Sequence, residues 1–147
     1  MSLPSVYSLD GLSASQSKVL SLSGGRSIAR EIVISVLRRR GHEVDWRSLL
    51  MDAPADFDDY ELVVMELEDN DPDGLASCRR LRDFSKVPVL VLVPGAAKSQ
   101  GIRALEIGAD SFMLVPFDRR ELIARAEALI RRYRGFVPPN SAEAGVP

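Results

Sequence analysis

The sequence predicts an α/β fold in which helices cover both faces of a doubly wound parallel sheet. Short apolar runs recur along the chain, and glycine, proline or acidic residues follow them, which is typical of strands buried on both faces. Segments with amphipathic helical spacing separate these runs. This alternation favours parallel strands joined by right-handed crossovers, and a length of 147 residues fits one domain.

The composition is ordinary for a globular protein and narrows the function classes. It is 46% hydrophobic and 27% charged with a net charge of −2, so nothing in it indicates a nucleic-acid or membrane surface. One cysteine, Cys78, excludes an internal disulfide, and one histidine, His42, excludes a multi-histidine metal site. No apolar stretch is long enough to span a bilayer. We therefore expect a cytoplasmic protein that holds no metal or cofactor.

The chain is expected to begin with a flexible leader over residues 1–17, which are rich in serine and show no periodicity. Lys18–Leu22 is predicted as the first strand. Ser27 is suited to cap the following helix, because its hydroxyl can accept a hydrogen bond from a free amide of the first turn. Gly41 ends that helix.

The next repeat of strand and helix is less regular. His42–Arg47 is predicted as the second strand. Pro54 and four aspartates interrupt residues 48–60, so we expect only a short or irregular helix there. Glu61–Glu66 is predicted as the third strand, and Glu66 stands at its carboxyl end.

The second half of the domain contains two more strands and three helices. Asp118 and Glu121 have the spacing of a capping box at the start of the last helix. The predicted elements are the helices Gly74–Phe84, Lys98–Ile107 and Asp118 to about Arg134, and the strands Val87–Val93 and Ser111–Val115. The domain would thus span residues 18–134, and residues 135–147, with three prolines, have the composition of a linker toward a further domain.

The flavodoxin-like strand order 2-1-3-4-5 is the natural choice for a (βα)5 chain of this length. Ligands of such sheets bind beyond the carboxyl ends of the strands, at the switch point between the first and third strands. The turn Ser23–Gly25 and the carboxylate of Glu66 are therefore expected to face the same crevice.

Several segments, in order and at family spacing, resemble the receiver domain of bacterial response regulators. The stretch around Ala104–Asp110 and Pro116–Arg125 is the most specific, and it is closest to the subfamily whose receivers precede a winged-helix DNA-binding domain. The other matching segments are Glu61–Leu67, Asp71–Gly74, Cys78–Arg82 and Val87–Leu92. The resemblance implies a signalling domain rather than an enzyme.

The resemblance also implies where the phosphorylation site would lie, and this sequence departs from it. The phosphoacceptor aspartate corresponds to Glu66, and the acidic pair that holds Mg²⁺ corresponds to Ser23 and Gly24. Mg²⁺ is usually held by one or two fixed carboxylates, which these two positions do not supply. We therefore expect that aspartate-type phosphotransfer has been lost.

Three further positions of the family's site would read the phosphoryl group. The hydroxyl position after the fourth strand corresponds to Val93, and the lysine position after the fifth strand corresponds to Val115. A valine offers neither a charge nor a hydrogen-bond donor. The aromatic switch position keeps its character as Phe112.

Three functions follow as hypotheses. The first is an atypical receiver that regulates by protein–protein contact and controls an attached DNA-binding output domain. The second is a constitutively active receiver in which Glu66 mimics the phosphorylated state, although a carboxylate carries less charge than a phosphoryl group. The third is a flavodoxin-like domain that binds a small molecule in the vestigial pocket.

The subfamily dimerises through the face formed by the fourth helix, the fifth strand and the fifth helix. Arg103, Glu121 and Arg125 are the candidate charged residues of that face. Two other charged positions of the family read Gly101 and Ser111. The resemblance therefore favours a homodimer through this face, and DNA contact only through a separate output domain.

Overall fold

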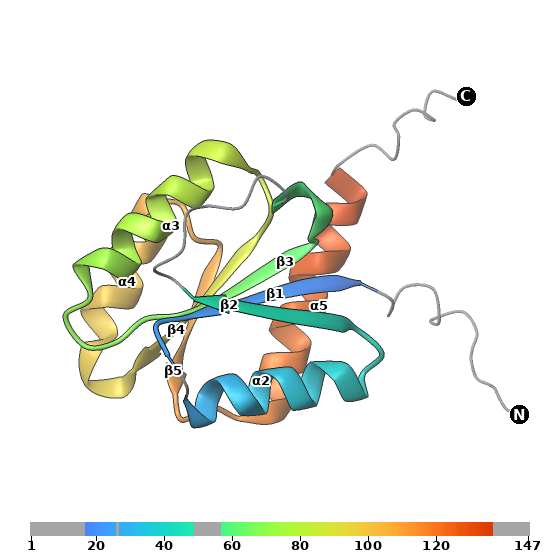
Figure 1. Cartoon of the computed structure of the whole chain (residues 1–147), viewed down its shortest axis with the longest axis horizontal. Helices are drawn as coiled ribbons and strands as arrows, with labels where there is room; N and C mark the ends of the chain where they lie inside the picture. Colours follow the sequence, from blue (N-terminus) through green and yellow to red (C-terminus); the bar gives the residue numbers. More distant parts are fainter. Residues whose placement is uncertain (1–16, 26, 49–56, 137–147) are drawn as a thin grey trace, which may run out of the picture.

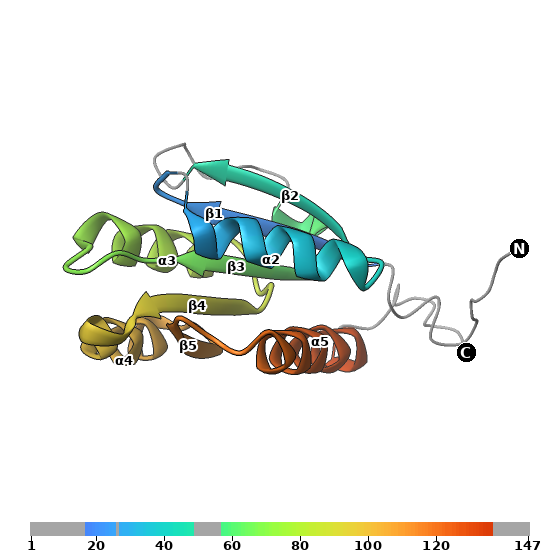
Figure 2. The ribbon, with the colours of Figure 1, turned by 90° about the horizontal axis from the view of Figure 1, so that it is seen from below.

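The computed structural model describes residues 17–25, 27–48 and 57–136, which form a parallel sheet with helices on both faces (Figure 1). The sheet has five strands in the order β2-β1-β3-β4-β5, which confirms the predicted order (Figure 2). The strands are β1 (Lys18–Ser23), β2 (Glu43–Ser48), β3 (Leu62–Glu66), β4 (Val89–Pro94) and β5 (Ser111–Val115). The helices are α2 (Ile28–Arg39), α3 (Pro72–Phe84), α4 (Lys98–Ile107) and α5 (Arg119–Phe136), with short 3-10 turns at Phe57–Asp59 and Gly95–Ala97.

Each face of the sheet has its own apolar core. On one face Val33 of α2 and Leu122 of α5 pack against the strands. On the other face Cys78 of α3 and Ala104 of α4 do so. Cys78 is buried as a small apolar side chain, and this burial raises the pKa of its thiol.

The central strand β3 links the two cores. Its apolar residues Leu62 and Val64 lie in the core beneath α2 and α5, whereas Val63 and Met65 lie in the core beneath α3 and α4. None of the four is more than 1% exposed. The prediction of a strand buried on both faces is thereby confirmed, and β3 is the strand on which both layers pack.

Two helices begin at the caps that the sequence predicts. Ser27 Oγ accepts a hydrogen bond from the backbone N–H of Arg30 at 2.9 Å, at the start of α2. Asp118 Oδ1 accepts one from the backbone N–H of Arg120 at 2.7 Å, at the start of α5. Each bond satisfies an amide that has no partner within the first turn.

α3 begins earlier than predicted, at Pro72 instead of Gly74. Asp71 caps it through a 2.8 Å hydrogen bond from the Gly74 amide, and proline is favoured in the first turn because it lacks the N–H that would otherwise need a partner. In the predicted irregular segment 48–60, the described part is the 3-10 turn Phe57–Asp59, and residues 49–56 lie outside the described part of the chain.

The two ends of the domain differ slightly from the prediction. Ser17, assigned to the leader, is buried, and its carbonyl accepts a hydrogen bond from the Glu43 amide at 2.8 Å. α5 continues through Phe136, so Gly135 lies inside the helix rather than in the linker. The remaining leader residues 1–16 and the tail 137–147 lie outside the described residues.

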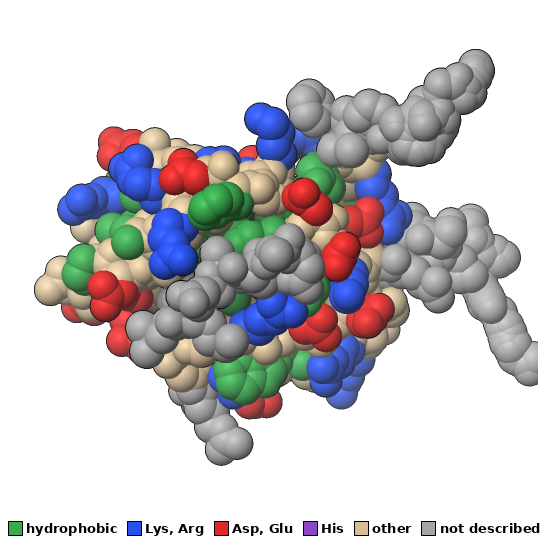
Figure 3. Space-filling model, turned by 45° about the horizontal axis from the view of Figure 1, so that its top comes forward, with side chains coloured by type: hydrophobic (Ala, Val, Ile, Leu, Met, Phe, Trp, Pro, Cys, Tyr) green, Lys and Arg blue, Asp and Glu red, His purple; other side chains and the backbone are tan. Residues whose placement is uncertain are grey.

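The described surface carries no large patch of one charge on the face seen in Figure 3, where acidic and basic side chains are interspersed. This agrees with the net charge of −2 for the whole chain. In the part of the chain that the structure describes, no helix is both long and apolar enough to cross a membrane.

Candidate functional site

Glu66 is the last residue of β3 and lies at the edge of the sheet formed by the carboxyl ends of the strands, which we call the mouth. Its carboxylate is held from one side. Ser27 Oγ donates a 2.6 Å hydrogen bond to Glu66 Oε1 while accepting the amide bond that caps α2. Because Ser27 is the N-cap of α2, this bond holds the carboxylate at the start of that helix. The sequence predicts Ser27 as a cap but gives no signal for this second bond.

The turn after β1 follows the strand that pairs with β3, with Leu22 opposite Met65, and so lies at the same edge of the sheet as Glu66, but it carries no carboxylate of its own. Ser23 is buried, and its hydroxyl donates to the carbonyl of Gly25 at 2.8 Å. A Cβ at Gly24 would lie 3.5 Å from Glu68 Oε2. Among the described residues, no group of three or more His, Cys, Asp or Glu side chains is placed to hold a metal ion.

The two valine positions face different cores. Val93 is fully buried in the core beneath α3 and α4, and Phe112 packs against that same core. Val115 packs against the core beneath α2 and α5. The structure thus brings Val93 and Phe112 to one face of the sheet and places Val115 on the other. Neither valine can donate a hydrogen bond to a group at the mouth.

Arg30 of α2 and Trp46 of β2 contact each other. The Arg30 guanidinium lies 4.0 Å from the centre of the Trp46 ring, which is a favourable cation–π contact. Its Nη1 also donates to the Gly25 carbonyl at 3.1 Å, so Arg30 ties α2 to the turn after β1. Arg30 is buried, whereas Trp46 remains about half exposed at 48%.

The face for which docking is predicted is exposed and has an apolar component. The α4–β5–α5 surface, as we define it, consists of the apolar residues Ile102, Leu105 and Leu114 and the charged residues Arg103, Glu121 and Arg125, all of them exposed. A hollow of about 570 Å³ lies within it, and its lining includes Leu105, Leu114, Phe117, Glu121 and Arg125. Exposed apolar side chains interspersed with charged ones suit protein contact.

Two of the charged candidates pair with each other inside the chain. Arg125 Nε donates to Glu121 Oε2 at 3.0 Å, one turn apart on α5. Arg125 Nη1 also donates to Ser111 Oγ at 2.7 Å. Arg125 thereby connects α5 to β5, and Ser111, which stands where the family has an acid, serves as its acceptor. Arg103 is exposed on α4.

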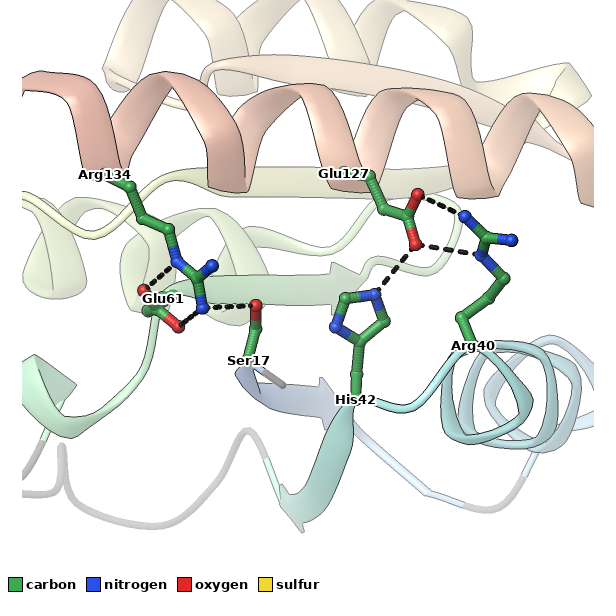
Figure 4. Close-up of polar contacts among 6 residues, drawn as sticks. All are labelled: Ser17, Arg40, His42, Glu61, Glu127 and Arg134. Carbon is green, nitrogen blue, oxygen red and sulfur yellow. Dashed lines mark hydrogen bonds and ion pairs between the residues drawn. The ribbon is translucent and has the colours of Figure 1, made fainter. Parts of the chain in front are cut away.

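A polar cluster that sequence reasoning did not find holds α5 to the turn between α2 and β2 (Figure 4). Glu127 accepts hydrogen bonds from Arg40 Nε and Nη2 at 2.9 and 2.8 Å, and its Oε2 lies 2.9 Å from His42 Nε2. Burial by itself raises the pKa of the Glu127 carboxyl, but the hydrogen bonds from Arg40 and His42 outweigh it and hold that pKa below its ordinary value. From the sequence alone His42 needed no special role; in the structure it is buried in this cluster.

A second cluster holds the end of α5 to the sheet (Figure 4). Arg134 donates to both carboxylate oxygens of Glu61, at 2.6 and 2.8 Å, and to Ser17 Oγ at 3.0 Å. The hydrogen bond with Glu61 raises the pKa of Arg134 above its ordinary value. α5 is thus fixed at two points along its length, both on the side of β1, β2 and β3.

The order of strands, the helix layers and the mouth at Glu66 define a receiver fold. The profile of the response regulator receiver domain matches residues 26–127, and the chain belongs to that family. The family is one of signalling domains, so the chain is not an enzyme. Two similar solved structures are a two-component response regulator from Clostridium difficile and a receiver domain from Francisella, each with a TM-score of 0.64 over 81% of this chain, at 21% and 23% identity. The two matches cover 99% and 100% of those chains, and the solved structures have the same fold as this chain.

Curated relatives are named as transcriptional regulatory proteins. One from Picosynechococcus is 29% identical over 92% of this chain and 58% of its own length. SpaR of Bacillus subtilis is 30% identical over 80% of this chain and 53% of its own length. CseB of Streptomyces avermitilis is 43% identical over 49% of this chain and 31% of its own length. The chain therefore spans about a third to somewhat over half of the length of these relatives.

Proposed function

We propose that this receiver regulates without being phosphorylated, by protein–protein contact through the α4–β5–α5 surface. The observation that carries the proposal is the hydrogen bond from Ser27 to Glu66. Glu66 stands at the phosphoacceptor position, and this bond engages its carboxylate in a contact within the fold. The apolar Val93, buried in the core, supports the same reading. Phosphoryl transfer depends on positioning the phosphoryl group and on neutralising its charge, and the side chains of Val93 and Val115 do neither.

The alternative in which Glu66 imitates a phosphorylated aspartate has less support. Such a mimic needs a polar group near the ends of β4 and β5 that responds to the carboxylate. The Glu66 carboxylate is bonded toward α2, and Val93 offers it no hydrogen bond. A small-molecule function in the mouth has no further observation in its favour among the described residues.

The partner in this proposal is a second copy of the chain, and the output is transcriptional. The relatives named as transcriptional regulators are longer than this chain, which fits a DNA-binding domain of winged-helix type attached after α5. Residues beyond α5 would then form the linker. The two clusters that fix α5 would let a change at the α4–β5–α5 surface reach that linker without bending the helix.

Replacing Leu105 with arginine tests the docking surface. Leu105 lines the hollow and is 40% exposed, so an arginine there would replace an apolar contact of a dimer by a charge that must lose its water. The matched control is Phe84→Arg, because Phe84 is also on a helix and is 69% exposed, but it lies on α3. We expect sedimentation to show a dimer for the unaltered chain and for Phe84→Arg, and a monomer for Leu105→Arg. A monomer in the unaltered chain at high concentration would contradict the proposal.

A further inference from the structure

Phe112 fills a notch that Gly101 leaves in α4. A Cβ built on Gly101 would lie 2.4 Å from Cδ1 of Phe112 and 2.7 Å from its Cγ and Cε1. Side-chain carbons do not approach one another this closely in a packed interior, since contact begins near 3.5 Å. The phenyl ring of Phe112 therefore occupies the space that a side chain at position 101 would need.

The identity of the contacting atoms decides how the ring could respond to a larger residue. The Cγ atom joins the ring to Cβ, so rotation of the ring about its own axis cannot move Cγ away from residue 101. With the backbone in place, only rotation about χ1 relieves the contact, and that rotation takes the whole ring off α4. A side chain at position 101 and the present position of Phe112 exclude each other.

The place of Phe112 connects this exclusion to the docking surface. Phe112 packs against the core beneath α3 and α4, yet it also contributes to the hollow that Leu105, Leu114 and Arg125 line. Its backbone carbonyl lies 3.4 Å from Arg125 Nη1. A ring expelled from the notch would enter this hollow and change its shape and its apolar content.

We propose that Gly101 is the positioning residue of the α4–β5–α5 surface: it holds Phe112 inward and so keeps the surface in one shape without any event at Glu66. The link to docking rests on the proposed function, whereas the position of the ring does not. In this account glycine at position 101, where the family has a basic residue, removes a charge and also allows the fixed contact with the Phe112 ring.

The test is a double-mutant cycle on the full chain, combined with NMR. In the unaltered protein we expect nuclear Overhauser contacts between the Gly101 α-protons and the Phe112 ring. Gly101→Ala should abolish the inward ring position and lower the folding equilibrium constant by roughly 5- to 150-fold, the usual range for overpacking. In a Phe112→Ala background, the same Gly101→Ala change should be neutral or stabilising, because the notch is then empty and alanine favours a helix.

Gly135→Ala is the matched control, since Gly135 lies in α5 with nothing within 4 Å of its added Cβ, and it should stabilise the protein. The inference is overturned if Gly101→Ala stabilises the unaltered protein as Gly135→Ala does, or if the Phe112 resonances do not move. It is also overturned if Phe112→Ala fails to rescue Gly101→Ala. A monomeric unaltered chain would overturn the docking proposal while leaving these ring and stability results intact.

Discussion

Replacing Met65 with alanine is expected to lower the free energy of unfolding by about 2–5 kcal/mol, the usual cost of truncating a fully buried side chain. Met65 is 0% exposed and lies in the core beneath α3 and α4, on the central strand of the sheet. Its removal leaves a cavity between β3 and the helices, because the neighbouring strands are fixed by their backbone hydrogen bonds. Equilibrium unfolding in urea measures the change.

The adjacent residue provides the matched comparison. Glu66→Ala removes the hydrogen bond with Ser27 but leaves Ser27 able to cap α2, so we expect a loss of about 1 kcal/mol. The contrast would show that the strand serves as scaffold and that its terminal carboxylate is dispensable for stability. A larger loss for Glu66→Ala than for Met65→Ala would contradict this reading.

Replacing Glu127 with alanine is expected to be the second most damaging change and to lower the free energy of unfolding by about 2–3 kcal/mol. Glu127 is the shared acceptor of Arg40 and His42, and His42 is buried at 4% exposure. Without the carboxylate, the imidazole remains buried without that partner and α5 loses a contact with the turn between α2 and β2. The control is Glu121, an exposed glutamate on the same helix that pairs with Arg125. Glu121→Ala removes only this i,i+4 ion pair, which is worth a few tenths of a kcal/mol.

The same residue gives a prediction for low pH. The folded-state pKa of Glu127 lies below its ordinary value of 4.5, so its ionised form stabilises the fold above that pH. This contribution is lost as the pH falls below 4.5 and through the lower folded-state pKa. Stability measured as a function of pH should therefore decline less steeply in this acid range for Glu127→Ala than for the unaltered protein. An identical acid decline in both would contradict the assignment.

The fold was predictable because its signals are local. The apolar run Leu62–Met65 and the capping serine Ser27 each lie within a few residues of the structure that they specify. Alternation of strands and helices then leaves few possible sheet orders. The errors lie at element ends, such as the start of α3, where Asp71 and Pro72 together begin the helix before the apolar periodicity does.

The contacts that join distant segments were not predictable. Glu127 and His42 are 85 residues apart in the chain, and Glu61 and Arg134 are 73 apart. Their side chains look like ordinary polar surface positions until the fold brings α5 against α2 and β3. Position 101 is similar, because the sequence shows a missing basic residue there but not the Phe112 ring that takes its space.

The central claim is that the phosphorylation chemistry is absent, and intact-mass spectrometry tests it most directly. The full chain would be incubated with acetyl phosphate and Mg²⁺, beside Glu66→Gln and beside a receiver that has the complete acidic site. The account predicts a gain of one phosphoryl group on the complete receiver and no gain on this chain or on Glu66→Gln. A gain of one phosphoryl group on this chain that Glu66→Gln abolishes would contradict it.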